Sequence, residues 1–409
     1  MNDRSFLQAV VSGAGGTTVS TETQQNDLGE ELVRVALGVA QHRPELVWAY
    51  FGPESWLDEA RLTPDDAQTL LRRANELCAR AETYNDAFVY GEANALAAHL
   101  GSMLGERQSF QDFVRRVLDI DKVRPSADEL AHLRSQVLEL AANVVGGHDP
   151  VNRWETTFAI VGEAKWNIAI EAYVEGRRWL ATKYPLPIVE DLEIGRDTEH
   201  HSSVHMNWKS GQTMRLGINP TVPRTPQTTR FEVAHNAYPG DYLRIAALTQ
   251  YAYQSKAITA ACVKLKDAPE SVISEGLEDT AYLRLVASPT PEDILATKLE
   301  WLRRGVAASA AVMARDENVP RSIVAEFLMK DGFMGSDRVE NELRLVDHPV
   351  WGPYRATYWA GRELITSADR IATASNLGSD YLRFLFGELH TPRSLLAALE
   401  TQVTAAAPA

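Results

Sequence analysis

The apolar residues of this 409-residue chain recur mostly at intervals of three and four positions, a spacing that places them on one face of an α-helix. This pattern runs from Leu28 to about Val145, and helical spacing returns from Gly162 to Trp179. Ser126 and Glu129 have the spacing of a capping box, which marks the start of a helix. We therefore expect the N-terminal half, residues 28–189, to be helical.

Strand-like alternation is confined to residues 190–219. Leu216 and Ile218 sit among polar neighbours there, and Pro220 closes the segment. We expect a small β-sheet within residues 190–228, the only convincing strands of the chain. Helical spacing returns afterwards, which predicts a C-terminal helical half over residues 229–400.

The two ends of the chain have a different composition. Residues 1–27 are small and polar, with too little apolar surface to offset the entropy of ordering, so they are expected to form a flexible arm. Residues 401–409 end in an alanine-rich frayed tail. Between them, residues 28–400 are expected to form a single, mainly α domain with the small sheet at its centre.

The composition of the chain indicates which classes of binding partner the protein can have. The net charge of −14 opposes approach to nucleic acid or to an anionic membrane. No apolar run reaches the roughly 18 residues that a membrane span needs. The two cysteines, Cys78 and Cys262, provide no disulfide framework and suit a reducing compartment. We expect a soluble, cytoplasmic protein whose partner is a small molecule or a short peptide.

The segment Phe-Glu-Val-Ala-His-Asn-Ala-Tyr-Pro-Gly-Asp-Tyr-Leu at residues 231–243 carries the candidate chemistry. It resembles the His-Glu-x-x-Pro-Gly-His-His signature of the DUF885 family, whose members look like zinc metallopeptidases. His235, Pro239 and Gly240 match the signature. The family's remaining positions are altered in this chain.

Further segments extend the resemblance. Residues 273–279 resemble the second, Glu-Gly segment of the family, which supplies an acidic ligand. Residues 214–220 resemble its short strand before the metal helix, and residues 358–365 resemble its Tyr-x-x-Gly helix. The resemblance spans roughly residues 45 to 400, and it implies a metallopeptidase-like fold in which the metal helix packs beside the small sheet.

The resemblance implies a ligand set of His235, Asp241 and Glu275. Six residues on an ideal helix would point His235 and Asp241 about 120° apart, but a break at Pro239 and Gly240 would allow them to converge. Aspartate in place of histidine is a mild change, because carboxylate oxygen binds zinc, iron and manganese. We expect a divalent ion, zinc or alternatively iron or manganese.

Asn236 stands where the family has its presumed general base. An amide cannot accept a proton near neutral pH, so a contribution of about 100- to 10,000-fold to hydrolysis is missing. Glu232, Glu278 and Asp279 are conceivable substitutes, although the last two are more typical of surface or supporting carboxylates.

Other polar residues are candidates for the functional site, although each could instead have a structural role. Tyr238 and Tyr358 could polarise a substrate oxygen near the metal, or could pack in the core. Arg215 could hold a substrate carboxylate, as could Arg362, although a surface role is the commoner one. A further group of histidines could supply ligands or acid–base groups, or could lie in an exposed loop; they are His200, His201 and His205.

Three functions are compatible with these features. The first is a divergent metal-dependent enzyme that carries out a non-hydrolytic or altered reaction on a small carboxylate-bearing metabolite. The second is a metal-dependent peptidase or amidohydrolase with a displaced base. The third is a non-catalytic binding protein that has no metal.

Overall fold

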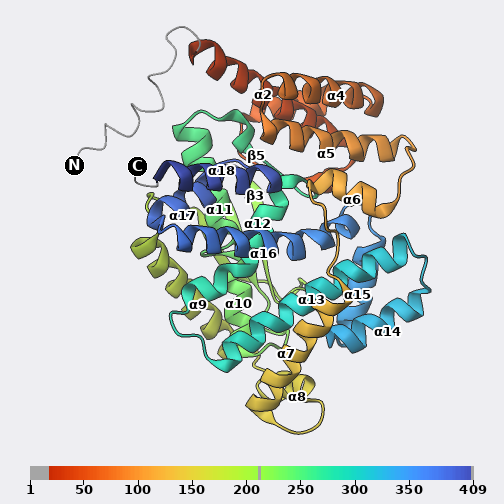
Figure 1. Cartoon of the computed structure of the whole chain (residues 1–409), viewed down its shortest axis with the longest axis vertical. Coiled ribbons are helices and arrows are strands. Elements are labelled where there is room, and N and C mark those ends of the chain that lie inside the picture. Colours follow the sequence, from red (N-terminus) through yellow and green to blue (C-terminus); the bar gives the residue numbers. More distant parts are fainter. Residues whose placement is uncertain (1–17, 211–212, 407–409) are drawn as a thin grey trace.

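The structure is a computed structural model that describes residues 18–210 and 213–406 of the chain. Helices dominate it, which confirms the mainly α fold expected from the apolar spacing (Figure 1). The helices of the N-terminal half are α2 (Thr18–His42), α3 (Glu54–Leu62), α4 (Ala67–Thr83), α5 (Ala87–Met103), α6 (Phe110–Leu118), α7 (Ala127–Val145), α8 (Pro150–Thr157) and α9 (Gly162–Lys183), with a short 3₁₀ turn η1 (Pro44–Leu46) after α2.

The second half is also helical. Its elements are α10 (Pro226–Asn236), α11 (Asp241–Ala247), the π-helix η2 (Leu248–Ser255), the 3₁₀ turn η3 (Thr259–Cys262), α12 (Pro269–Leu285), α13 (Pro291–Arg315), α14 (Arg321–Gly332), α15 (Ser336–Asp347), α16 (Trp351–Ala374), α17 (Gly378–Gly387) and α18 (Pro392–Ala406).

Side-chain caps explain several helix starts. The predicted capping box is confirmed, because Ser126 and Glu129 bond each other's backbone N–H groups at the start of α7. Thr290 and Asp293 form a second box at the start of α13. These reciprocal bonds satisfy backbone donors that the first helical turn leaves unpaired.

The expected small sheet is present. It has the order β2-β4-β3, with β2 (Leu192–Arg196) parallel to β4 (Thr213–Ile218) and β3 (Val204–Ser210) antiparallel to it. The expectation that these are the only strands was wrong, because β1 (Val47–Tyr50) pairs with β5 (Val263–Leu265). Strands of three and four residues are too short to show alternation in the sequence.

The two ends of the chain differ in how far the structure describes them. Helix α2 begins at Thr18, inside the segment predicted as a flexible arm, and residues 1–17 lie outside the described residues. Helix α18 runs to Ala406, inside the segment predicted as a frayed tail, and residues 407–409 lie outside the description. Among the described residues, no helix is long and apolar enough to cross a membrane.

Helices α12 and α16 pack against each other near the middle of the molecule (Figure 1). Their backbones meet at Gly276 and Gly361, where a Cβ atom on either glycine would collide with the other helix. Helix α12 also packs against α10. This close packing brings the polar residues of α12 and α16 beside the end of α10, where the candidate motif lies.

Candidate metal centre

Helix α10 positions His235 in its last turn. The helix begins at Thr225, whose side chain accepts a hydrogen bond from the Thr228 backbone, and it ends at Asn236. A Cβ atom at position 240 would overlap the carbonyl oxygens of Ala234 and His235, so only glycine allows the chain to turn back this tightly. The predicted break at Pro239 and Gly240 is therefore confirmed, and α11 begins directly after it.

Two glutamates of α12 face the imidazole of His235. Glu275 and Glu278 are three residues apart, which places them on the same side of the helix, and they are only 3% and 4% exposed. His235 Nε2 lies 3.6 Å from Glu275 Oε2 and 3.1 Å from Glu278 Oε2. One ligand atom from each of the three residues lies within 4.8 Å of the others.

These distances fit a metal ion. Bonds of about 2.0–2.2 Å in a tetrahedral zinc site imply ligand–ligand separations of roughly 3.3–3.6 Å. Among the described residues, the buried atoms Glu275 Oε2 and His235 Nδ1 have no hydrogen-bond partner. The Nδ1 atom lies 3.3 Å from Asp279 Oδ1, the arrangement of a carboxylate that orients a ligand histidine. The residues present therefore fit a divalent ion.

Strand β5 and the residue that follows it add two lysines to the site. Lys264 lies on β5 and Lys266 directly after its end, and their Nζ atoms lie 4.9 and 5.0 Å from the ring centre of Trp48. Lys264 Nζ lies 2.5 Å from Asp241 Oδ1 and 4.0 Å from Glu278 Oε1. Lys266 Nζ lies 3.9 Å from the Glu275 carboxylate. The carboxylates of the site are thus partly balanced by cations of the chain.

Helix α16 contributes two tyrosines. Tyr354 donates a hydrogen bond to Glu275 Oε1 and accepts one from Lys266 Nζ at 2.8 Å. The ring of Tyr358 stacks on the imidazole of His235 with centroids 6.5 Å apart. Arg304, from α13, lies 4.3 Å from the centre of the Tyr358 ring and forms an ion pair with Asp279.

The environment sets the protonation of the site. Burial, and then the charge of Arg304, holds the pKa of His235 well below its ordinary value, so the imidazole is neutral and keeps a lone pair for a metal. Burial also raises the pKa of Glu278 well above its ordinary value, with Asp241 and Glu275 adding to the rise and Lys264 opposing it. A divalent ion would relieve this repulsion between carboxylates.

The structure brings together three of the predicted site residues: His235, Glu275 and Tyr358 lie in direct proximity. Asp241 is buried nearby, with its carboxylate paired to Lys264. Asn236 donates to the backbone oxygen of Glu232 in its own helix, at 2.8 Å.

The other candidates lie in different surroundings. Tyr238 is buried between Tyr173 and Tyr242, with ring centroids 6.0 and 5.3 Å away, and its hydroxyl has no hydrogen-bond partner in the part of the chain that the structure describes. Arg215, on β4, donates to the backbone oxygen of Arg196 at 3.3 Å.

The remaining polar candidates are also held elsewhere. Glu232 is bound by Ser203 and Arg224, and the guanidinium of Arg362 stacks 3.9 Å from the ring centre of Trp359. The histidines before the sheet stack on one another, with the ring centroid of His200 at 4.6 Å from that of His201 and at 3.7 Å from that of His205.

Several residues of the site were not assigned to it from sequence. Glu278 and Asp279 are buried and face His235, so a surface position was the wrong alternative for them. The three-residue spacing from Glu275 to Glu278 was a signal that could have identified the second glutamate. Lys264 and Lys266 gave no such signal, because β5 is only three residues long and Lys266 lies just beyond its end.

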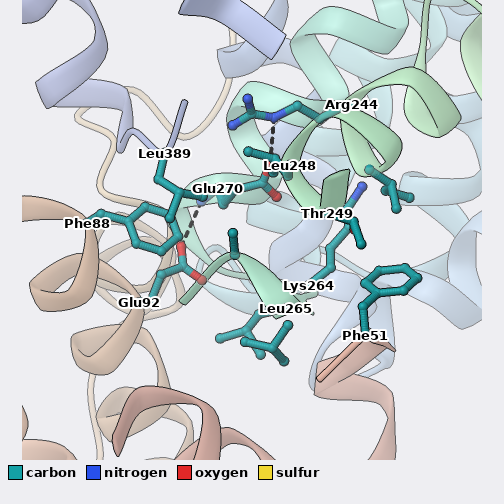
Figure 2. A pocket seen from close by; sticks show the side chains of 13 residues that line it. Phe51, Phe88, Glu92, Arg244, Leu248, Thr249, Lys264, Leu265, Glu270 and Leu389 are labelled. Carbon is teal, nitrogen blue, oxygen red and sulfur yellow. Dashed lines mark hydrogen bonds and ion pairs between the residues drawn. The ribbon is translucent and has the colours of Figure 1, made fainter. Parts of the chain in front are cut away.

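A separate small cavity lies beside β5 (Figure 2). Arg244 Nε donates to Glu270 Oε1 at 3.0 Å there, and Glu92 accepts from the Glu270 backbone at 2.9 Å. The cavity has a volume of about 20 Å³, enough for a single water molecule. Within residues 18–210 and 213–406, the buried atoms Arg244 Nη2 and Glu270 Oε2 have no hydrogen-bond partner.

Comparisons with known proteins define the fold. No protein-family model matches the chain, and no curated protein matches it. A solved structure titled "putative lipoprotein" from Colwellia psychrerythraea aligns with a TM-score of 0.60 at 14% identity, covering 85% of this chain and 68% of that one. A second such protein, of unknown function, from Shewanella oneidensis aligns with a TM-score of 0.53 at 10% identity, covering 85% and 70%. At these identities the likeness is one of fold alone.

Proposed function

We propose that this protein is a divalent-metal-dependent enzyme that acts on a small carboxylate-bearing substrate, with His235, Glu275 and Glu278 holding the ion. The observation that carries the proposal is the convergence of three buried or nearly buried ligand atoms within 4.8 Å. One neutral imidazole and two carboxylates suit zinc, and also iron or manganese. The ion would supply Lewis-acid or redox chemistry to a bound substrate.

The proposed ligand set includes Glu278 in place of Asp241. The carboxylate of Asp241 is already 2.5 Å from Lys264 Nζ, whereas that of Glu278 is 4.0 Å from the same atom. The Glu278 carboxylate also lies closer to His235 Nε2 than that of Glu275 does. In this arrangement Asp241 is not a ligand, and its carboxylate balances the charge of Lys264 beside the site.

The altered motif favours a reaction other than standard peptide hydrolysis. Asn236 cannot act as a base, and its side chain bonds its own helix. Of the conceivable substitutes, Glu232 is bound by Arg224 at 2.8 Å, and Asp279 is paired with Arg304. The DUF885 resemblance supports a metalloenzyme ancestry, and a hydrolase with a displaced base is the less favoured form of the proposal.

A metal-free binding protein is the second candidate, and one observation favours it. Three cations of the chain already face the carboxylates of the site: Lys264, Lys266 and Arg304. Such a network can be satisfied without an ion, although breaking a buried pair is costly. The cytoplasmic location expected from the sequence stays a prediction, since the two structural neighbours described as lipoproteins resemble this chain in fold alone.

The deciding experiment is elemental analysis of protein purified without an affinity tag, before and after anaerobic incubation with zinc, iron(II) and manganese. We expect about one ion per chain in the wild type, loss in His235→Ala, and at least about tenfold weaker binding in Glu278→Gln. Asp241→Asn is the matched control, because it also removes a buried carboxylate but leaves the three ligands in place.

The alternative outcomes are distinct. Loss of metal in Asp241→Asn but not in Glu278→Gln would return Asp241 to the ligand set. Absence of metal from every sample would overturn the enzyme proposal in favour of the metal-free binding protein.

A further inference from the structure

Lys266 lies in a cage of aromatic rings at the edge of the candidate metal centre. Its Nζ atom is 5.0 Å from the ring centre of Trp48, 5.7 Å from that of Trp351 and 4.6 Å from that of Tyr354. These distances are within the range of cation–π attraction, which holds an ammonium group in place without using its N–H donors. The cage fixes the position of the charge and leaves its hydrogen bonds available.

The ammonium of Lys266 has spare donors. It has three N–H groups, and it donates to the Tyr354 hydroxyl at 2.8 Å. The nearest carboxylate oxygen, on Glu275, is 3.9 Å away, beyond hydrogen-bonding distance. Among the described residues, two of its donors therefore lack a protein acceptor. Its side chain is 10% exposed, and the adjacent rings of Trp48 and Trp351 are partly exposed.

The other two cations of the site are already committed. Lys264 Nζ lies 2.5 Å from Asp241 Oδ1. Arg304 is held by an ion pair with Asp279 and by the ring of Tyr358. Lys266 is therefore the cation best placed to bind a ligand.

The charges of the side chains around Lys266 indicate the charge that a bound ligand should carry. Four carboxylates belong to the cluster, those of Asp241, Glu275, Glu278 and Asp279, and three cations face them, Lys264, Lys266 and Arg304. With all of these groups ionised, the four carboxylates and three cations carry a net charge of one negative, which a divalent ion would change to one positive. A single negative charge on the ligand would then restore neutrality in a buried site, where unbalanced charge is expensive.

We infer that Lys266 binds the carboxylate group of the substrate beside the ion, and that the rings of Trp48 and Trp351 contact the apolar part of the same molecule. This inference rests on the proposed function and names its substrate class, a monocarboxylate with a hydrocarbon or aromatic portion. A phosphate group fits less well, because a dianion would exceed the single positive charge. No arginine fork stands free to bind it bidentately among the described cations of the cluster.

The test uses 4-fluorobenzoate as the probe and ¹⁹F NMR line broadening as the measurement, on zinc-loaded and metal-free protein. Hydrogen bonds to a charged group contribute about 1.5–3 kcal/mol, so Lys266→Gln should weaken binding to the zinc-loaded protein by about 10- to 100-fold. Lys266→Arg keeps the charge and should restore most of the affinity. Lys256→Gln is the matched control, because Lys256 also lies over an aromatic ring, that of Tyr251, but is exposed.

A second measurement uses the wild type alone, so it decides the question even if the Lys266→Gln variant does not fold. In the wild type, 4-fluorobenzoate should slow the acetylation of Lys266 by acetic anhydride, followed by mass spectrometry, and should leave Lys256 unaffected. Equal affinity in wild type and Lys266→Gln, or acetylation of Lys266 that the probe does not slow, would overturn the inference. Displacement of the probe by inorganic phosphate at lower concentration than by acetate would overturn the carboxylate assignment.

Metal analysis of the same samples separates this inference from the proposed function. If the wild type binds no metal, the enzyme proposal fails, and the metal-free titration alone decides the role of Lys266. Binding that depends on Lys266 in metal-free protein would preserve the carboxylate site, whereas binding that ignores Lys266 would overturn both proposals.

Discussion

The phenol of Tyr354, on α16, donates a hydrogen bond to the carboxylate of Glu275, on α12, 79 positions away in the sequence. This bond occupies Glu275 Oε1 and leaves Oε2 directed at His235. Because Tyr354 also accepts a hydrogen bond from Lys266, one hydroxyl links α16, α12 and the residue that follows β5. The orientation of a candidate metal ligand therefore depends on a residue that binds no metal itself.

Substituting Tyr354→Phe should weaken metal binding. Loss of a supporting hydrogen bond typically reduces metal affinity by about 10- to 100-fold, and here Glu275 would lose the bond that orients it. The measurement is competition with a chelator of known affinity. Tyr50→Phe is the control, because it removes a hydrogen bond that another buried tyrosine donates to the backbone oxygen of Pro53 and not to a candidate metal ligand. Equal losses in both variants would contradict a specific role for Tyr354.

The crossing of α12 and α16 should be intolerant of side chains. A Cβ atom at position 361 would lie 2.7 Å from the backbone nitrogen of Gly276 and would collide with the carbonyl oxygen of Val272. Because backbone cannot move aside like a flexible side chain, Gly361→Ala should destabilise the protein by about 1–3 kcal/mol or more, seen as a lower Tm. Gly335→Ala, where no atom lies within 4 Å, should change stability by less than about 1 kcal/mol. Similar Tm values for the two variants would show that the helices can separate at little cost.

Glu92 should make stability depend on pH. Burial raises its pKa from 4.5 to about 8, with the Glu270 N–H opposing the rise and the Glu270 charge adding to it. Between these values the folded protein keeps a proton that the unfolded chain has lost. The free energy of unfolding should therefore fall as pH rises from about 4.5 to 8, by up to about 1.4 kcal/mol per pH unit.

Urea unfolding across this pH range tests the effect. Glu92→Gln cannot ionise, so its unfolding free energy should decline less between pH 5 and 8 than that of the wild type. Glu139→Gln, at an exposed position on α7, serves as the control for loss of a carboxylate. Parallel curves for wild type and Glu92→Gln would refute the assignment.

The helical fold could be predicted because its physical signals are local. Apolar spacing of three to four residues and the Ser126–Glu129 cap act within single helices, and both are present in the structure. The pairing of β1 with β5 could not be predicted in this way. It joins Val47 to Leu265 across more than half the chain, and neither strand is long enough to show a period.

The candidate site could be predicted in part for the same reason. His235 and Glu275 lie in segments whose resemblance to a known signature could be read directly, and the structure brings them together. The cations that balance them come from β5, the residue after it and α13, and no sequence pattern links Lys266 or Arg304 to α10. The charged side chains of the site come together only when α12 packs against α10 and α16 in the folded protein.

Asp279 offers the sharpest test of whether His235 binds metal. Its carboxylate oxygen lies 3.3 Å from His235 Nδ1, on the side of the ring away from the Nε2 atom that faces Glu278. If Nε2 binds an ion, Asp279 holds the ring in the tautomer that leaves Nε2 free, and Asp279→Asn should reduce metal affinity by about 10- to 100-fold. Chelator competition measures the change.

Asp241→Asn is again the appropriate control, because each substitution removes a buried carboxylate that is paired with a cation, Lys264 in one case and Arg304 in the other. Both variants should lose stability, but only Asp279→Asn should also lose metal affinity. A drop in affinity that merely follows the loss of stability in both variants would mean that Asp279 holds Arg304 and does not orient the histidine. His235 would then lack the support that a metal ligand requires.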